Sequence, residues 1–344
     1  MNMERTIRFG VAGLKHGQEH VRAILAHPRA ELAVCCDLDE NLFHSLKLPP
    51  EIGFTKNFDD MIRRNDLDAV VISLPTPLHA EYSILSMEAG KDVLCEKPLA
   101  LTVVEGMRIC EAIRRTGRVF QLGYEVRYSP FQQKILEICR SGEIGTVTNV
   151  WWNMFCERTN TGWRNDRKNF GGKLFDCGCH YYNLMETWAG APAKRLCVFG
   201  NEIGQTGPTA DVLPQTAIVM FEYANGVRGV FNLSDHCPNM QNSTCGIAGT
   251  NGKIEADPYY PDQAGSLDVH AQGGKFRYNI RIQGYHSEKF TGGHLGFYEQ
   301  YEAFISSILE HAPVQVTAEQ GIWITRILSA IDRSLSTGNA VSIE

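Results

Sequence analysis

Residues 92–98 read Asp-Val-Leu-Cys-Glu-Lys-Pro, an apolar strand that ends abruptly in an acid, a base and a proline. Alternating strand and helix patterns precede this stretch, and a new set of elements follows it. In open α/β folds, ligands bind beyond the carboxyl ends of parallel strands. Lys97 is therefore the first candidate for chemistry. The alternative is a solvated lysine that pairs with Glu96 at the start of a loop.

The first 124 residues alternate between buried strands and helices, which predicts a doubly wound parallel sheet. The predicted strands are residues 7–12, 32–36, 68–74, 92–98 and 118–123. One predicted helix runs from His79 to Ala89 and is stopped by Gly90. Another begins at a capping box formed by Thr102 and Glu105, and it runs to Gly117.

The turn after the first strand, residues 13–18, departs from the G-x-G-x-x-G pattern of dinucleotide sites. Counting from Gly13, the second and third glycine positions hold Lys15 and Gln18. The second strand ends in Asp37, where an acid can accept hydrogen bonds from an adenosine ribose. Because Leu38 follows and no arginine is adjacent, NAD is favoured over NADP. The alternative for Asp37 is a helix or turn cap.

The third predicted strand is closed by Leu74 and then by Pro75-Thr76-Pro77, a rigid turn expected to lie over the cofactor. His79 is expected to begin a helix near the nicotinamide and not to act as a catalyst.

The second part of the chain changes character. Ser129 and Pro130 predict a helix that ends near Gly142. Residues 146–156, 194–199, 216–223, 227–234 and 253–257 read as antiparallel strands, with hairpin signals at Asn225-Gly226 and Asn251-Gly252. We expect an open, mostly antiparallel sheet whose free face forms a homo-dimer or homo-tetramer. Helices at 294–310 and 317–337 are expected to return in part to the first domain, so the domains are 1–124 and 125–344.

Length and composition bound the class of protein. The 344 residues suit two domains, and 43% hydrophobic with 21% charged residues is typical of globular proteins. A net charge of -6 and the lack of a basic run argue against nucleic acid and favour a small-molecule partner. We find no export signal and no apolar stretch that could span a membrane, so a cytoplasmic location is expected.

Eleven cysteines are scattered through the predicted strands and helices, as expected for buried thiols in a reducing compartment. Cys177, Cys179 and His180 are the one group that offers soft metal ligands. No second Cys/His pair at zinc spacing accompanies them, so no metal is expected.

Residues 171–183 read as a helix entered through Gly171 and Gly172. Asp176 and His180 are four residues apart and would share one helical face. A histidine near neutrality can take the proton of an alcohol, and a neighbouring carboxylate can orient it or hold other substrate hydroxyls. A surface pair is the alternative for these two residues taken alone.

Together these motifs resemble the Gfo/Idh/MocA family (glucose-fructose oxidoreductase, inositol dehydrogenase and rhizopine-catabolism proteins) over nearly the whole chain. The matching motifs are Asp68-Ala69-Val70-Val71, Glu88-Ala89-Gly90-Lys91, Glu96-Lys97-Pro98, Ser141-Gly142-Glu143-Ile144-Gly145, Gly171-Gly172 with Asp176 and His180, and Ser334-Leu335-Ser336-Thr337-Gly338.

The resemblance implies a Rossmann domain followed by an open mixed or antiparallel sheet, with NAD or NADP as hydride carrier. It implies that His180 removes a hydroxyl proton and that Lys97 hydrogen-bonds the developing alkoxide, where positive charge is favourable. Asp176 corresponds to the aspartate of the second motif. A cis peptide bond before Pro98 is also implied.

The candidate site residues follow from these patterns. For the cofactor they are Gly13, Leu14, Lys15, His16, Asp37, Leu74, Pro75, Thr76, His79, Glu96 and Lys97. For the substrate they are Lys97, Glu125, Arg127, Asn153, Trp163, Arg164, Asp176 and His180. Trp152, Glu157 and His294 are further pocket candidates, with core or loop positions as the alternative.

Two departures from the family affect the substrate site. Glu125 stands where many relatives have asparagine, and Asn183 stands where aspartate is frequent. Both bear on which substrate hydroxyls are recognised.

The sequence is compatible with three functions. The leading one is an NAD-dependent dehydrogenase of a secondary alcohol on a sugar, glycoside or cyclitol. The second is a redox-neutral enzyme that retains NAD, by sugar–sugar hydride exchange or oxidation-assisted glycoside cleavage. The third is a catalytically silent metabolite sensor, which the presence of Lys97 and His180 argues against.

Overall fold

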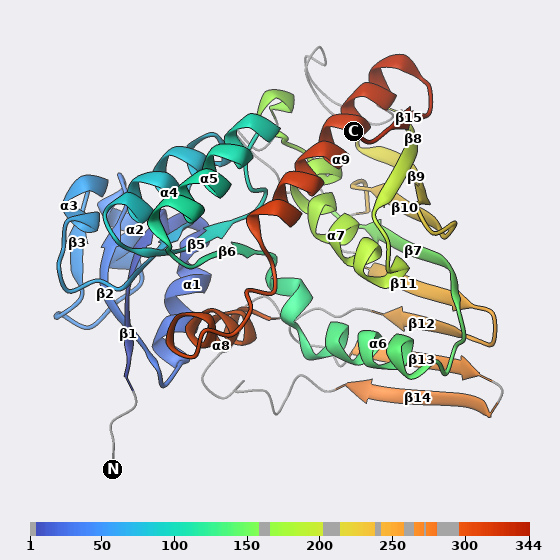
Figure 1. Ribbon diagram of the computed structural model, residues 1–344, viewed down its shortest axis with the longest axis horizontal. Helices are drawn as coiled ribbons and strands as arrows, with labels where there is room; N and C mark the ends of the chain where they lie inside the picture. The colour runs from blue at the N-terminus through green and yellow to red at the C-terminus, as the bar shows by residue number, and fades with distance from the viewer. Residues whose placement is uncertain are drawn as a thin grey trace. The chain divides into compact units, whose positions relative to one another are not determined.

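The chain folds into two compact units, each with its own sheet (Figure 1). The computed structural model describes residues 5–157, 166–201, 214–237, 242–257, 265–271, 273–280 and 296–344. Over these residues, the first unit comprises 5–129 and 296–323, and the second comprises 130–280 and 324–344. The first unit is thus built from two separate parts of the chain.

The first unit contains a parallel sheet with strand order β3-β2-β1-β4-β5-β6. Its strands are β1 (Ile7–Ala12), β2 (Ala30–Cys36), β3 (Gly53–Thr55), β4 (Ala69–Ile72), β5 (Asp92–Glu96) and β6 (Phe120–Gly123). The order reverses between β1 and β4, which is where doubly wound sheets bind ligands. The predicted parallel sheet is confirmed.

Helices cover both faces of this sheet. They are α1 (Leu14–Ala26), α2 (Glu40–Ser45), α3 (Phe58–Ile62), α4 (His79–Glu88), α5 (Val103–Thr116) and α8 (Phe297–Leu309), with 3-10 turns η1 (Thr76–Leu78) and η2 (Glu125–Tyr128). Figure 1 shows α1 and α8 on one face and α4 and α5 on the other. The predicted capping box of α5 is confirmed, with reciprocal bonds between Thr102 and Glu105.

The core on the α1 side depends on residues from both ends of the chain. Phe9 of β1 packs edge-on against Tyr301 of α8, with ring centroids 5.3 Å apart. Ile24 of α1 and Phe304 of α8 are completely buried in the same cluster. The distant helix α8 is therefore a structural part of the first sheet's core.

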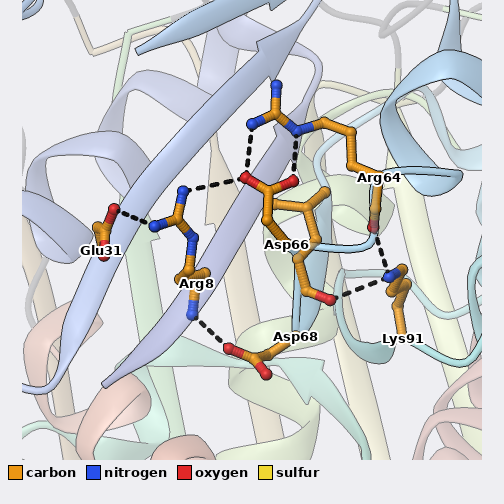
Figure 2. A network of polar contacts seen from close by, with 7 residues as sticks. Arg8, Glu31, Arg64, Asp66, Asp68 and Lys91 are labelled. Atoms are coloured by element: carbon orange, nitrogen blue, oxygen red, sulfur yellow. Dashed lines mark hydrogen bonds and ion pairs between the residues drawn. The ribbon is translucent and has the colours of Figure 1, made fainter. Parts of the chain in front are cut away.

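The amino ends of the strands are joined by a polar network (Figure 2). Asp66 accepts hydrogen bonds from Arg64 and Arg8, and Asp68 accepts one from the backbone N–H of Arg8. The buried Lys91 donates to the carbonyls of Arg64 and Leu67 at 2.7 and 2.9 Å. These contacts fix the sheet at the end opposite to the carboxyl ends of its strands.

The second unit contains a mixed sheet, nine-stranded over the described residues, with order β14-β13-β12-β11-β7-β10-β9-β8-β15. Its strands are β7 (Val147–Phe155), β8 (Ala193–Asn201), β9 (Thr216–Tyr223), β10 (Arg228–Ser234), β11 (Asn242–Gly249), β12 (Lys253–Asp257), β13 (Gly265–Ala271), β14 (Gly274–Ile280) and β15 (Val341–Ser342). All pairs are antiparallel except β7 with β10. The predicted mostly antiparallel sheet and both predicted hairpins are confirmed.

The helices of the second unit are α6 (Pro130–Ser141), α7 (Gly178–Ala189) and most of α9 (Ala318–Thr337), with the 3-10 turn η4 (Arg167–Asn169) and the π-helical turn η5 (Lys173–Cys177). Residues of α9 up to Trp323 belong to the first unit. No helix in the described part of the chain is long and apolar enough to cross a membrane.

One face of the second sheet is covered by α7. Trp152 of β7 stacks on Tyr181 and Trp188 of α7, with ring centroids 4.2 and 5.7 Å apart. The opposite face carries exposed apolar side chains on three adjacent strands, namely Phe199 of β8, Ile218 and Met220 of β9 and Val230 of β10. We call these four residues the open-face patch.

Candidate active site

The turn between β1 and α1 accepts only glycine at its first position. Gly13 has a φ of 85°, and a Cβ atom there would lie 2.3 Å from the carbonyl oxygen of Ser73. Its N–H donates to the carbonyl of Cys36 at 2.8 Å. The turn is thereby held tightly against the ends of β2 and β4, and it leaves the amino end of α1 at the carboxyl edge of the sheet.

The turn after β1 is shorter than the sequence pattern suggested. The helix α1 begins at Leu14, directly after Gly13, so the expected turn through Gln18 is wrong. Gly17 lies against the sheet, because a Cβ atom there would be 3.1 Å from Val11 Cγ1. Close packing of helix on strand is the role of the third glycine in dinucleotide folds, and here Gly17 performs it. In the sequence, the signal for this close packing was the second glycine, Gly17, four residues after Gly13.

Asp37 connects the second strand to the start of α1. Its Oδ2 accepts a hydrogen bond from the backbone N–H of Leu14 at 2.6 Å, and its Oδ1 accepts one from Asp39 N–H at 2.9 Å. A carboxylate at a helix amino terminus is favoured by the helix dipole. Asp37 is therefore a cap of α1, and it remains half-buried at the edge where a ribose would bind.

Two predicted cofactor residues beside α1 differ in exposure. Lys15 is exposed, whereas the side chain of His16 is 27% exposed and its Nε2 lies 3.8 Å from Glu96 Oε1. Leu14 is buried. Lys15 and His16 thus stand in the first turn of a helix, whose backbone N–H groups and dipole suit an anionic pyrophosphate.

His79 is a completely buried structural residue of the loops after β4 and β5. Its two ring nitrogens lie 2.8 Å from the carbonyl oxygens of Leu74 and Pro98. Burial lowers the pKa of His79, although the two carbonyls and Glu96 act in the opposite direction. Leu74 and Pro75 remain half-buried, whereas Thr76 is buried.

Glu96 is buried at the end of β5 and is not part of a solvated pair. Its Oε1 is 2.9 Å from Nε2 of His20, and its Oε2 accepts the backbone N–H of Lys97 at 3.2 Å. Burial would raise the pKa of Glu96, but the His20 hydrogen bond and the charges of His16, His20 and Lys97 hold it well below its usual range. The peptide bond between Lys97 and Pro98 is cis, as the family resemblance implied.

Glu125 and Arg127 lie in η2, within the first unit. Glu125 is buried, and its carbonyl lies against Gly296, where a Cβ atom would be only 1.9 Å away. Arg127 donates to the side-chain oxygen of Gln320 at 3.4 Å. Gln320 was not identified from the sequence, because nothing in its own helix pattern links it to residue 127.

Asp176 and His180 lie in the second unit on a distorted helix start. Lys173–Cys177 is a π-helical turn entered through Gly172, whose φ is 82°, and a regular α-helix begins only at Gly178. The expectation of one regular helix through both residues is therefore wrong, although the glycine entry is confirmed. Asp176 is buried in the π turn, and His180 is half-buried in the first turn of α7.

The π turn is supported by Tyr182 and Gly178. The Tyr182 hydroxyl donates to the carbonyl of Leu174 at 2.8 Å, and it passes over Gly178, where a Cβ atom would lie 2.6 Å from that hydroxyl. The thiol of Cys179 donates to the carbonyl of Asp176 at 3.1 Å. Helical π turns frequently mark functional sites.

Among the described residues of the second unit, the predicted substrate residue Asn153 does not lie with Asp176 and His180. Asn153 donates to Thr244 Oγ1 at 3.0 Å. It alternates with Trp152 along β7, so it lies on the face of the sheet opposite to α7. Trp152 belongs to the core and Glu157 is exposed. Trp163, Arg164 and His294 lie outside the described residues.

The described residues do not form a recognisable metal-binding site. They contain no group of three or more His, Cys, Asp or Glu side chains that could hold a metal ion. The eleven cysteines are free thiols, and seven of them, including Cys179, are buried.

The first unit therefore defines a class of protein, a dinucleotide-binding fold whose glycine turn, helix amino end and acid lie at one sheet edge. A family model described as oxidoreductase family, NAD-binding Rossmann fold, matches residues 7–124. A second, described as oxidoreductase family, C-terminal alpha/beta domain, matches residues 137–343. The chain belongs to the Gfo/Idh/MocA oxidoreductase family.

Relatives and solved structures agree with this assignment. The chain is 26% identical to D-xylose 1-dehydrogenase (NADP(+)) 2 of Haloferax volcanii, over 95% of this chain and 93% of that protein. It is 25% identical to scyllo-inositol 2-dehydrogenase (NAD(+)) of Bacillus subtilis, over 73% and 74%. The crystal structure of an oxidoreductase domain protein from Kribbella flavida shares the fold, with a TM-score of 0.86, 23% identity and coverage of 99% and 100%.

Proposed function

We propose that this protein is an NAD-dependent dehydrogenase that oxidises a secondary alcohol of a sugar, glycoside or cyclitol. The observation that carries the proposal is Lys97, which follows a buried, ionised Glu96 at the carboxyl end of β5 in an NAD-binding oxidoreductase fold. A cation at this edge can stabilise negative charge that develops on a substrate oxygen. The likeness to the xylose and inositol dehydrogenase relatives supports the substrate class.

The chemistry divides between the cofactor and the protein. Oxidation of the alcohol releases a hydride from carbon and a proton from oxygen, and bound NAD supplies the hydride acceptor. His180 takes the hydroxyl proton as general base. Lys97 hydrogen-bonds the oxygen as it becomes an alkoxide, and Asp176 orients His180 or holds a second substrate hydroxyl. Glu125 and Arg127 contribute further polar contacts to the substrate.

We infer NAD and not NADP from Asp37. Its carboxylate has acceptor capacity for the two ribose hydroxyls, whereas a 2′-phosphate there would meet like charge. Gly13, Lys15 and His16 lie at the amino end of α1, where the pyrophosphate would bind. The two named relatives differ in cofactor, so the test is a direct comparison of NAD and NADP binding by calorimetry. Tighter binding of NADP would contradict this choice.

The function is tested by near-ultraviolet absorbance of the purified protein with NAD across a panel of inositols, aldoses and glycosides. Growth of the reduced-nicotinamide band with one compound is the expected result. Lys97→Ala and His180→Ala are expected to lower kcat by about a hundredfold or more. Lys194→Ala and His44→Ala, at exposed positions, serve as matched controls.

If both Lys97→Ala and His180→Ala turned over the substrate at the wild-type rate, the catalytic roles proposed for these two residues would be wrong. If the absorbance does not change with any compound and NAD stays bound to the protein through gel filtration, the redox-neutral alternative would be favoured. A flat trace with ligand-dependent capture of a protein partner would favour the sensor.

We further infer that the chain forms a homo-oligomer through the open-face patch. Phe199 and Ile218 pair across β8 and β9, and Met220 and Val230 pair across β9 and β10. These four side chains are 39% to 61% exposed. A contiguous apolar patch on a sheet face is typical of a protein interface.

A further inference from the structure

We propose that Tyr301 and His20 are positioning residues that hold the carboxylate of Glu96, which in turn fixes the backbone of Lys97. The inference rests on the proposed function, because it assigns these residues to the lysine that would act on the substrate oxygen. Every contact that supports it lies within the first unit.

The backbone around Lys97 is tethered on both sides. Before the lysine, its own N–H donates to Glu96 Oε2 at 3.2 Å. After it, the carbonyl of Pro98 lies 2.8 Å from Nδ1 of the buried His79. The first tether depends on where the Glu96 carboxylate lies, so anything that moves this carboxylate also moves the Lys97 amide.

The fold leaves a specific space for the Glu96 carboxylate. Glu96 pairs with Gly123 of β6, and a Cβ atom on Gly123 would lie 3.2 Å from Glu96 Oε1. The carboxylate is only 5% exposed, so it cannot rely on water for its hydrogen bonds. A buried carboxylate needs protein partners, and His20 supplies one at 2.9 Å.

The hydrogen-bond pattern fixes the tautomer of His20. A carboxylate only accepts hydrogen bonds, so Nε2 of His20 carries the proton that faces Glu96. Nδ1 of His20 is 3.0 Å from the Tyr301 hydroxyl. This hydroxyl donates to Nδ1 when the ring is neutral and accepts from it when the ring is protonated. The link between Tyr301 and Glu96 therefore persists in both charge states of His20.

Close packing restricts the side chains of His20, Tyr301 and Glu96. His20 and Tyr301 are completely buried, and the His20 ring meets Phe297 edge-on at 4.9 Å. Burial and the charge of Glu96 raise the pKa of Tyr301 well above its ordinary value, so its hydroxyl stays protonated. The network thus joins α1, β5 and α8 at the residue that precedes Lys97.

The test is Tyr301→Phe, which removes one hydroxyl and keeps the ring. Amide hydrogen exchange at Lys97, read from peptides spanning 92–101, is expected to become about tenfold faster. With the substrate found in the absorbance assay, kcat should fall about tenfold while the KM for NAD changes less than about twofold. Tyr298→Phe is the matched control, because Tyr298 lies in the same helix as Tyr301 but its ring packs on His27.

Unchanged exchange at Lys97 in Tyr301→Phe would overturn the proposal. So would equal acceleration in β1 and β4, since the hydroxyl would then stabilise the whole fold and not position the lysine. If Tyr301→Phe does not fold, Glu96→Asp makes the same test, because it keeps the charge but withdraws it from His20. The exchange measurement needs no substrate, so its failure is separate from wild-type turnover by Lys97→Ala, which would contradict the proposed function.

Discussion

Glu96 is a buried carboxylate that stays ionised. Its two oxygens are both used, one by His20 and one by the Lys97 amide. Such a buried charge is costly to leave unpaired, so removal of either the charge or a partner should be measurable in stability.

We predict a pH-dependent effect of Glu96→Gln. The pKa of Glu96 is lowered in the folded protein, so its ionised form contributes stability that is complete above the unfolded value of about 4.3. That contribution is lost as the pH falls through the lower folded pKa. Urea unfolding should show a cost of roughly 2 kcal/mol at pH 7. The cost should shrink at about pH 3.5, and a constant cost would contradict the assignment.

Candidate site residues could be predicted from the sequence where a charged side chain directly follows a buried strand. Lys97 and Asp37 follow buried strands, and the structure places both at the carboxyl edge of the first sheet. His20 and Tyr301 could not be found in this way, because their partners lie 76 and 281 residues away along the chain. Only the folded core brings them together.

Element boundaries were predictable where a local signal sets them. The capping box at Thr102 starts α5, and Asn225-Gly226 turns β9 into β10, both as expected. The strands β11, β13 and β14 were missed, because their short alternating patterns are interrupted by polar residues and glycines. Their pairing with neighbours stabilises them more than their own propensity does.

The π turn at Lys173–Cys177 shows a limit of spacing arguments. Residues four apart share a face only in a regular α-helix. Here the turn widens before Gly178, and Tyr182 hydrogen-bonds a carbonyl inside it. The orientation of Asp176 relative to His180 therefore depends on this π turn and on the Tyr182 side chain that supports it.

The turn between β1 and α1 supplies a prediction with an internal control. Gly13 and Gly90 both have a positive φ, at 85° and 80°, but of the two only Gly13 would bring a Cβ atom to 2.3 Å from a carbonyl oxygen. Gly90→Ala should cost about 1 kcal/mol of stability from backbone strain alone. Gly13→Ala should cost at least about 2 kcal/mol and weaken NAD binding.

Urea unfolding and calorimetric titration with NAD check both variants. Equal costs at the two glycines would show that the turn relaxes away from Ser73.

At the scale of the molecule, the two sheets differ in how many of their faces are covered by helices. The first is covered on both faces by helices, so its strands are nearly continuous runs of buried residues. The second has helices on one face, and β9 alternates strictly between buried and exposed residues from Ala217 to Phe221. That alternation made the open sheet predictable, whereas the parallel pairing of β7 with β10 has no local sequence signal.

The open-face patch predicts the assembly. Met220→Glu should weaken self-association by about thirtyfold or more, because it places a charge at the centre of an apolar contact. Met107→Glu on α5 is the matched control, since Met107 is also exposed but lies outside the patch. Sedimentation velocity checks both variants, and an unchanged mass for Met220→Glu would place the interface elsewhere.

The discontinuous first unit has a consequence for synthesis on the ribosome. Strands β1 to β6 end at Gly123, but α8, which buries Phe9 and its neighbours, begins only at Phe297. At typical rates of translation, the nascent sheet waits on the order of ten seconds for its covering helix. During that interval the apolar face beside α1 is open to chaperones and to other nascent chains, so the yield of folded protein should depend on the speed of translation.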